Sequence, residues 1–288
     1  MAPTLEGQAQ QQHSTSRGGD VWVPGVGDSW QHNLDTPVNT DVDVDVIFID
    51  LDNAQDTIDE LHGKGKYVCC YISLGTVESW REDAGAFPSP VVGSSWDDWQ
   101  GENVRDLMEV RVEKAARMNC DAIEPDNTSN WNQEGTGLTI SREEQVTYNK
   151  WFAETSPSES CNLLALFSDF DSLFLVRKHG MHVGMKNAIE LLGDLSDYYE
   201  IGINESCHVW NECGMSTLHA LLTRFAYKIP FLDKDKPVFN VEYDADCGIC
   251  DEANEERLDT IFKEYDLNPA MCSCADSSRD VDCSDVIG

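Results

Sequence analysis

The sequence predicts an α/β fold in which eight parallel strands close into a (β/α)8 TIM barrel, as a single domain behind an N-terminal tail. The length of 288 residues suits this fold, because such a barrel usually takes about 250 residues. Hydrophobic residues make up 41% of the chain, which is enough for one large core. Short apolar segments alternate with helix-like segments, and that alternation is typical of repeated βα units.

Eight apolar segments have the length and composition of barrel strands. In chain order they are 30–34, 46–51, 67–73, 122–126, 182–186, 200–204, 238–243 and, as the weakest, 271–274. Residues 1–20 are polar, so we expect a disordered tail there and a barrel domain over 21–288.

Five segments between the strands are predicted helices. They are 54–62, 102–118, 141–154, 215–227 and 254–265. Ser141 and Glu144 have the spacing of a capping box, which marks the start of the third helix. The second helix carries an apolar stripe that should pack on the outside of the barrel. The stripe consists of Val104, Met108, Val112 and Ala115.

The chain is strongly acidic, with 20 Lys and Arg against 53 Asp and Glu and a formal net charge of -33. Such a polyanion repels phosphate and anionic lipid, so we expect neither a nucleic-acid partner nor a membrane partner. It would instead concentrate a cationic ligand at its surface. Solubility in an acidic medium is the alternative explanation of the charge. No run of about 18 apolar residues occurs, so no transmembrane helix is expected.

Eleven cysteines favour disulfides and a secreted protein. Residues 1–20 contain no apolar segment of a signal peptide, so either the protein stays inside the cell or its true N-terminus differs. Cys69 and Cys70 lie in an apolar strand and are interpreted as buried free thiols.

The sequence contains no pattern that indicates a metal ion or a cofactor. Cys247 and Cys250 are followed by Cys272 and Cys274, whose spacing is wrong for a zinc ribbon. The alternating acids from Asp41 onward lack the glycine and the glutamate of a calcium loop. Phosphate-loop, dinucleotide, zinc-protease and serine-hydrolase patterns are also missing, so we predict no cofactor.

Polar side chains end most of the predicted strands, where functional groups of a barrel project. They are Asp50, Asp52, Tyr71, Ser73, Glu124, Asp126, Lys186, Asn187, Glu205, Glu242 and Tyr243. Each alone could be an ordinary strand-end residue, but together they form a ring of carboxylates. Hydrolysis of a glycosidic bond needs two carboxyl groups on either side of that bond, and this ring supplies them. Aromatic residues near the same loops could stack on sugar rings or could pack in the core. They are Trp80, Trp99, Trp131 and Tyr243.

Seven segments resemble glycoside hydrolase family 114, the endo-α-1,4-polygalactosaminidase family. They are DVIFIDLD (45–52), CYISLGTVESWRED (70–83), WQGENVRD (99–106), CDAIEPDN (120–127), VGMKN (183–187), NESCHVWNEC (204–213) and VFNVEYD (238–244). The resemblance spans about residues 22–244 and implies a (β/α)8 barrel.

The resemblance implies an extracellular, retaining enzyme that cleaves α-1,4 bonds in galactosamine-containing polysaccharide. It implies Asp126 as the nucleophile and Glu205 as the acid/base, with carboxyl groups about 5–5.5 Å apart. It also implies a Cys207–Cys213 bridge. A de-N-acetylated galactosamine polymer is cationic, which fits the acidic chain. We expect a monomer whose substrate contacts come from Asp50, Tyr71, Glu78, Arg81, Asp83, Trp99, Glu102, Glu124, Asn127, Lys186, Asn187, Glu242 and Tyr243.

The chain departs from the family pattern at about 156–177, where an apolar segment is inserted. A lid helix is one interpretation, and a retained intron or a faulty gene model is another, because an apolar loop there would expose hydrophobic surface. Two other functions stay open: an α-galactosidase that acts on neutral galactosides, and a barrel that binds polysaccharide without cutting it.

Overall fold

The computed structural model describes residues 22–53, 55–87, 102–133, 139–153, 176, 179–210, 212–213, 230–243 and 247–274. The predicted tail at 1–20, the predicted helix at 215–227 and nearly all of the inserted segment 156–177 lie outside these ranges.

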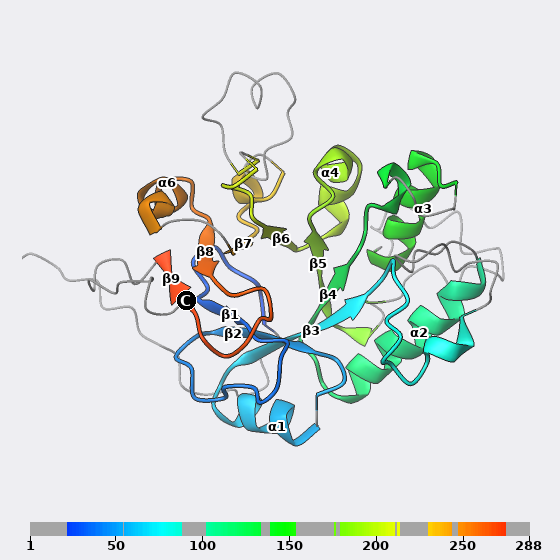
Figure 1. Ribbon diagram of the computed structural model, residues 1–288, viewed down its shortest axis with the longest axis horizontal. Helices are drawn as coiled ribbons and strands as arrows, with labels where there is room; N and C mark the ends of the chain where they lie inside the picture. Colours follow the sequence, from blue (N-terminus) through cyan, green and yellow to red (C-terminus); the bar gives the residue numbers. More distant parts are fainter. Residues whose placement is uncertain are drawn as a thin grey trace, which may run out of the picture.

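The described residues form one curled sheet whose strands follow one another in chain order (Figure 1). The strands are β1 (Trp30–His32), β2 (Val46–Asp50), β3 (Tyr67–Ser73), β4 (Ala122–Asp126), β5 (His182–Lys186), β6 (Ile201–Glu205), β7 (Val238–Glu242), β8 (Asp259–Phe262) and β9 (Cys272–Ser273). β1 to β8 pair in parallel, and β9 pairs with β8 antiparallel. Eight parallel strands in this order confirm the predicted barrel fold.

Side chains join the first strand of the barrel to the eighth. The Trp30 indole nitrogen donates a hydrogen bond to the Asp259 carbonyl oxygen over 2.7 Å. Lys263 Nζ donates to Gln31 Oε1 over 3.0 Å. β1 and β8 therefore lie side by side, and the sheet curls back toward its own first strand.

Helices pack on the outside of the sheet (Figure 1). They are α1 (Gln55–Gly63), α2 (Glu102–Arg117), α3 (Arg142–Ala153), α4 (Leu192–Leu195) and α6 (Cys250–Glu255). Short 3-10 helices are η1 (Ala84–Ala86), η3 (Asn130–Asn132), η7 (Ile189–Leu191), η8 (Ser196–Tyr198), η9 (Leu232–Lys234) and η10 (Cys247–Ile249). The predicted apolar stripe of α2, from Val104 to Ala115, is buried against the sheet.

The end of the barrel differs from the prediction. The segment 254–265 is not a helix, because α6 ends at Glu255 and β8 follows at Asp259–Phe262. Arg257 adopts a left-handed backbone (φ 62°), which reverses the chain between the two elements. Leu258, Ile261 and Phe262 have helical spacing, but Leu258 precedes β8 and the other two belong to it, so the periodicity was misleading. The predicted strand 271–274 is only the short antiparallel β9.

The two faces of the barrel strands bury different apolar groups. Inside the barrel, Trp30 packs on Phe48 and Phe239 with ring centroids 5.0 and 5.2 Å apart. Outside it, alternate residues such as Ile47 and Ile49 pack under the helices. The aromatic interior makes the barrel a filled core, so chemistry is restricted to its ends.

Three disulfides lie in the described part of the chain: Cys70–Cys120, Cys207–Cys213 and Cys250–Cys274. The interpretation of Cys70 as a free thiol was wrong. Adjacent strand residues point to opposite faces, so Cys69 enters the barrel interior as a buried free thiol and Cys70 reaches Cys120 on the outer face.

The capping box at the start of α3 is present. Glu144 Oε2 accepts a hydrogen bond from the Ser141 backbone nitrogen over 2.9 Å, and Ser141 Oγ accepts one from the Glu144 nitrogen over 3.2 Å. Replacing Ser141 by Ala should lower the free energy of unfolding by about 1 kcal/mol. Urea denaturation measures this, and Thr147→Ala on the same helix, which loses no cap, is the matched control.

Candidate active site

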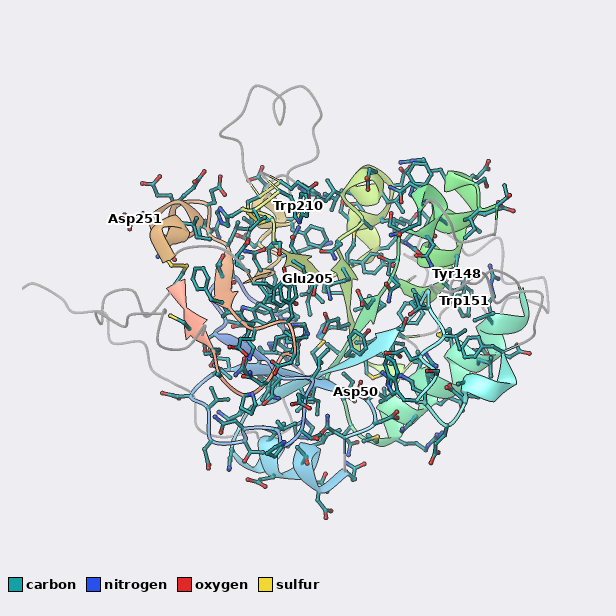
Figure 2. All side chains as sticks on the ribbon, viewed as in Figure 1. Asp50, Tyr148, Trp151, Glu205, Trp210 and Asp251 are labelled. Atoms are coloured by element: carbon teal, nitrogen blue, oxygen red, sulfur yellow. A yellow bond between two sulfur atoms is a disulfide. The ribbon has the colours of Figure 1, made fainter. Side chains whose placement is uncertain are left out.

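Three charged side chains meet at the carboxyl ends of β4, β5 and β6. Lys186 Nζ lies 3.4 Å from Asp126 Oδ1 and 3.5 Å from Glu205 Oε2. The side chains of Asp126 and Glu205 are 23% and 28% exposed, whereas that of Lys186 is 2% exposed. The two carboxylates therefore face solvent above a buried ammonium group (Figure 2 labels Glu205).

The shared lysine limits how far apart the carboxylates can be. Asp126 Oδ1 and Glu205 Oε2 both contact Lys186 Nζ, at 3.4 and 3.5 Å. The two oxygens are therefore at most 6.9 Å apart, which is the sum of the two distances. Two carboxyl groups at this separation can lie on opposite sides of one glycosidic bond.

Each carboxylate is also held by a tyrosine and by an asparagine. Tyr71 donates from its hydroxyl to Asp126 Oδ2 over 3.1 Å, and Asn127 Nδ2 donates to the same oxygen over 3.3 Å. Tyr243 donates to Glu205 Oε1 over 2.6 Å.

Asn187 contacts Glu205 twice. Its Nδ2 donates to Glu205 Oε2 over 3.2 Å, and its Oδ1 accepts from the Glu205 backbone nitrogen over 3.0 Å. Asn127 and Asn187 both have a left-handed backbone, with φ of 58° and 46°. Asparagine tolerates this conformation, which turns the chain sharply after β4 and after β5.

Glu124 supports the pair from below. It is fully buried, and it accepts hydrogen bonds from Lys186 Nζ over 2.8 Å and from His32 Nε2 over 3.1 Å. Burial raises the pKa of Glu124, but the charges of His32 and Lys186 and their hydrogen bonds outweigh it and lower that pKa to about 2. Glu124 is therefore a buried carboxylate that fixes Lys186 under the two exposed ones.

The same charges set the protonation of the surrounding groups. Burial acts to lower the pKa of Lys186, but Asp126, Glu124 and Glu205 raise it well above its ordinary value. Burial acts to raise the pKa of Glu205, but Lys186 and the Tyr243 hydroxyl lower it. Burial followed by nearby carboxylates raises the pKa of Tyr71 and Tyr243, so both hydroxyls keep their protons and donate.

A second cluster surrounds Arg81 beside Tyr71. The Arg81 guanidinium donates to Asp50 over 2.8 and 3.0 Å, to Asp52 over 2.8 Å, and to Glu78. It also lies 6.0 Å from the centroid of the Tyr71 ring. Burial raises the pKa of Glu78 in spite of Arg81. Asp50, Glu78 and Arg81 thus form an ion-pair cluster that packs against the Tyr71 side of the site.

Four of the predicted substrate contacts lie elsewhere or cannot be placed: Asp83, Trp99, Glu102 and Glu242. Asp83 accepts two hydrogen bonds from Arg111 of α2, over 2.7 and 2.8 Å, so it fixes that helix. Trp99 lies outside the described residues, as does the side chain of Glu102.

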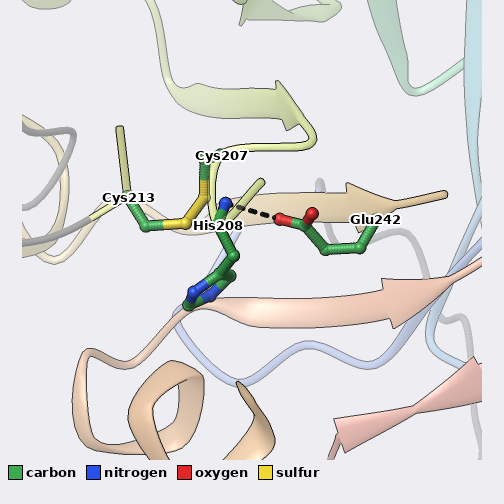
Figure 3. Close-up of side chains that lie close together, drawn as sticks. All are labelled: Cys207, His208, Cys213 and Glu242. Carbon is green, nitrogen blue, oxygen red and sulfur yellow. Dashed lines mark hydrogen bonds between the residues drawn. A yellow bond between two sulfur atoms is a disulfide. The ribbon is translucent and has the colours of Figure 1, made fainter. Parts of the chain in front are cut away.

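Glu242 was predicted at the cleft, but it points the other way. Its strand neighbours Val241 and Tyr243 belong to the cluster inside the barrel, so alternation puts Glu242 on the outer face. There it is fully buried and accepts from the His208 backbone nitrogen over 2.9 Å (Figure 3).

Cys207, His208, Cys213 and Glu242 offer potential metal-ligand atoms within 4.8 Å of one another (Figure 3). The two sulfur atoms are bonded to each other, so neither is a thiolate that could bind a metal ion. The disulfide instead links two positions of the loop that follows Glu205.

His32 was missed in the sequence because it lies inside the predicted segment 30–34, whereas the observed β1 ends at His32. Among the predicted aromatic residues, Trp80 is exposed and Trp131 packs against the outer core. Tyr243 holds Glu205.

A parallel barrel with two carboxylates close together at the carboxyl ends of its strands has the groups that hydrolysis of a glycosidic bond needs. The comparisons agree: the chain belongs to glycoside-hydrolase family GH114, whose family model matches residues 11–279. It is therefore a glycosidase.

Two solved structures share the fold. The structure of Aspergillus fumigatus Ega3 in complex with galactosamine is 24% identical, with a TM-score of 0.68 over 91% of this chain and 100% of that chain. The glycoside hydrolase domain of PelA from Pseudomonas aeruginosa is 11% identical, with a TM-score of 0.57 over 85% of this chain and 97% of that chain. The search of curated proteins found no match. Among the described residues, every helix is too short or too polar to span a membrane.

Proposed function

We propose that this glycosidase cleaves α-1,4 bonds in galactosamine-containing polysaccharide, with Asp126 and Glu205 as its catalytic pair. The observation that supports the proposal is that both carboxylates contact the same atom, Lys186 Nζ, at 3.4 and 3.5 Å. The upper limit of 6.9 Å between their nearest oxygens, the sum of those two distances, admits the separation of about 5–5.5 Å that retention needs. The same limit excludes most of the range of about 6.5–9.5 Å between carboxyl groups that is typical of inverting enzymes.

In the proposed mechanism, Glu205 gives its proton to the leaving oxygen while Asp126 attacks the anomeric carbon. The bond between that carbon and the leaving oxygen breaks, and an ester between the sugar and Asp126 forms. Glu205 then takes a proton from water, whose oxygen attacks the same carbon and releases Asp126. Two inversions at one carbon give net retention.

The hydrogen bonds around the pair suit these roles. Tyr71 and Asn127 both donate to Asp126 Oδ2, which aligns the other oxygen for attack. Tyr243 and Asn187 orient Glu205. Lys186 stabilises negative charge on whichever carboxylate is ionised.

The pKa of Glu205 leads to a prediction about pH. Because that pKa is lowered, the acid loses its proton as pH rises, so kcat/KM should be highest in acid and fall toward neutral pH. Tyr243→Phe removes a hydrogen bond to the charged form and should move this alkaline limb up by about one pH unit. Tyr71→Phe, which alters Asp126 instead, is the matched control and should leave the limb in place. If Tyr243→Phe shifted the acidic limb of the pH profile instead, the result would show that Glu205 is the nucleophile and not the acid/base.

The charge of the chain supports a cationic substrate. A net charge of -33 favours a polymer whose amino groups are free. The galactosamine in the Ega3 structure is of the same chemical class. The second candidate is a neutral α-galactoside, which the same carboxylates could cleave. Three described disulfides support an extracellular location.

A comparison of three substrates tests the proposal. Purified protein is incubated with de-N-acetylated galactosaminogalactan, with the same polymer after chemical N-acetylation, and with a neutral α-galactoside. We expect reducing ends to appear fastest from the first, with the advantage shrinking as salt is added. Equal rates on the first two would contradict the role of charge, and cleavage of the galactoside alone would establish the second candidate.

A further inference from the structure

Three exposed aromatic side chains lie in segments that follow the carboxyl ends of barrel strands. In the described part of the chain, the large exposed aromatic residues are Trp80, Trp210 and Tyr265, which are 75%, 70% and 69% exposed. Trp80 follows β3, Trp210 follows β6 and Tyr265 follows β8, so each belongs to a loop after the carboxyl end of a strand. A single exposed aromatic ring needs no explanation, so only the one that also contacts an active-site residue, Tyr265, is a candidate binding surface.

Tyr265 is linked directly to the catalytic pair. Its ring stacks on that of Tyr243, with centroids 4.7 Å apart and planes 15° apart. Tyr243 in turn donates to Glu205 Oε1 over 2.6 Å and is itself nearly buried. One face of Tyr265 therefore covers Tyr243, and the residue as a whole is nevertheless 69% exposed.

We propose that Tyr265 is a sugar-binding platform, which holds a hexosamine unit of the polymer in a subsite beside the catalytic carboxylates. The inference rests on the proposed function for the identity of the sugar. The flat C–H face of a pyranose packs on an aromatic ring, as other apolar groups do. A protonated amino group on that sugar adds attraction to the electron-rich face of the ring.

Charge around the platform favours the same ligand. Glu264 and Asp266 flank Tyr265 in the chain, and Glu205 lies beyond Tyr243. The net negative charge of these neighbours favours a cationic sugar at Tyr265 over an anionic one.

Binding measured without turnover tests the platform. All proteins carry Asp126→Asn so that the polymer stays intact, and the affinity for de-N-acetylated oligogalactosamine is measured by calorimetry. High salt is used to screen the net charge of the chain. Tyr265→Ala should weaken binding about tenfold. Tyr265→Phe keeps the ring and should bind as the parent does. Val23→Ala removes an equally exposed apolar group from the segment before β1 and should also have no effect.

A structural role would give a different pattern. If Tyr265 only covers Tyr243, Tyr265→Leu should restore whatever Tyr265→Ala loses, because leucine also covers the ring. The platform predicts that Leu fails and Phe succeeds. In proteins that keep Asp126, the platform also predicts that Tyr265→Ala raises KM more than it lowers kcat.

The outcomes separate the two proposals. If the native protein cuts the polymer but Tyr265→Ala binds within twofold of the parent, the platform is wrong and the proposed function stands. If the native protein binds the polymer without cutting it, and Tyr265→Ala weakens binding, the proposed function is wrong and the platform stands. A native protein that does not bind the polymer contradicts both.

Discussion

Asp126→Asn and Glu205→Gln should each lower kcat by at least about a thousandfold on the polysaccharide that the native protein cleaves. Each substitution keeps the size of the side chain but removes its negative charge beside Lys186, and with it the ability to attack or to transfer a proton. Affinity for the polymer should change little, because the amide still fits between the same tyrosine and asparagine.

The control for these two variants is Asp197→Asn, which makes the same chemical change on a side chain that is 80% exposed and follows α4. It should keep nearly full activity. If either catalytic variant kept a tenth of native kcat, that carboxylate would not be one of the pair.

Lys186→Met should be the most destabilising of the substitutions considered, with a loss of about 3–5 kcal/mol in the free energy of unfolding. The reason is Glu124, which is fully buried and would lose the hydrogen bond of 2.8 Å that Lys186 donates. The double variant Lys186→Met, Glu124→Gln should recover much of this loss, because no unpaired charge is then buried. Denaturant unfolding followed by circular dichroism measures all three proteins.

The stability of the protein at low pH should depend on the same interaction between Lys186 and Glu124. Because the folded protein lowers the pKa of Glu124 to about 2, its ionised form stabilises the fold above the ordinary pKa of a glutamate. This stabilisation should be lost as pH falls from about 4.5 toward 2. A single variant as stable as the native protein, or a double variant no more stable than the single one, would contradict this account of Lys186.

The barrel and its charged strand ends could be predicted from the sequence because that information is local, whereas the choice of Asp126 and Glu205 among the strand-end carboxylates came from the family resemblance. Each of the strands that carry Asp126, Lys186 and Glu205 is a short apolar run ending in a charged residue, and parallel strands bring those ends together. Lys186, the common partner of both carboxylates, could be placed at the correct strand end. Its distances to Asp126 and Glu205 could not be predicted, because they depend on the stagger between neighbouring strands.

Other features depend on which face a residue occupies, and composition does not determine that. Glu242 and Tyr243 are adjacent and both polar, yet only the second enters the site. Cys69 and Cys70 differ in the same way. β8 was missed because Leu258, just before it, and Ile261 and Phe262 within it have the spacing of a helix, and only pairing with β7 shows that this segment is a strand.

Product sizing tests the central claim most directly. De-N-acetylated galactosaminogalactan is incubated with the native protein and with Asp126→Asn, and the products are separated by size over time. If Asp126 and Glu205 act across internal α-1,4 bonds, the native protein should convert the polymer into short oligosaccharides, and the variant should leave it at full length. Polymer of unchanged size with the native protein, or equal shortening by both proteins, would contradict the claim.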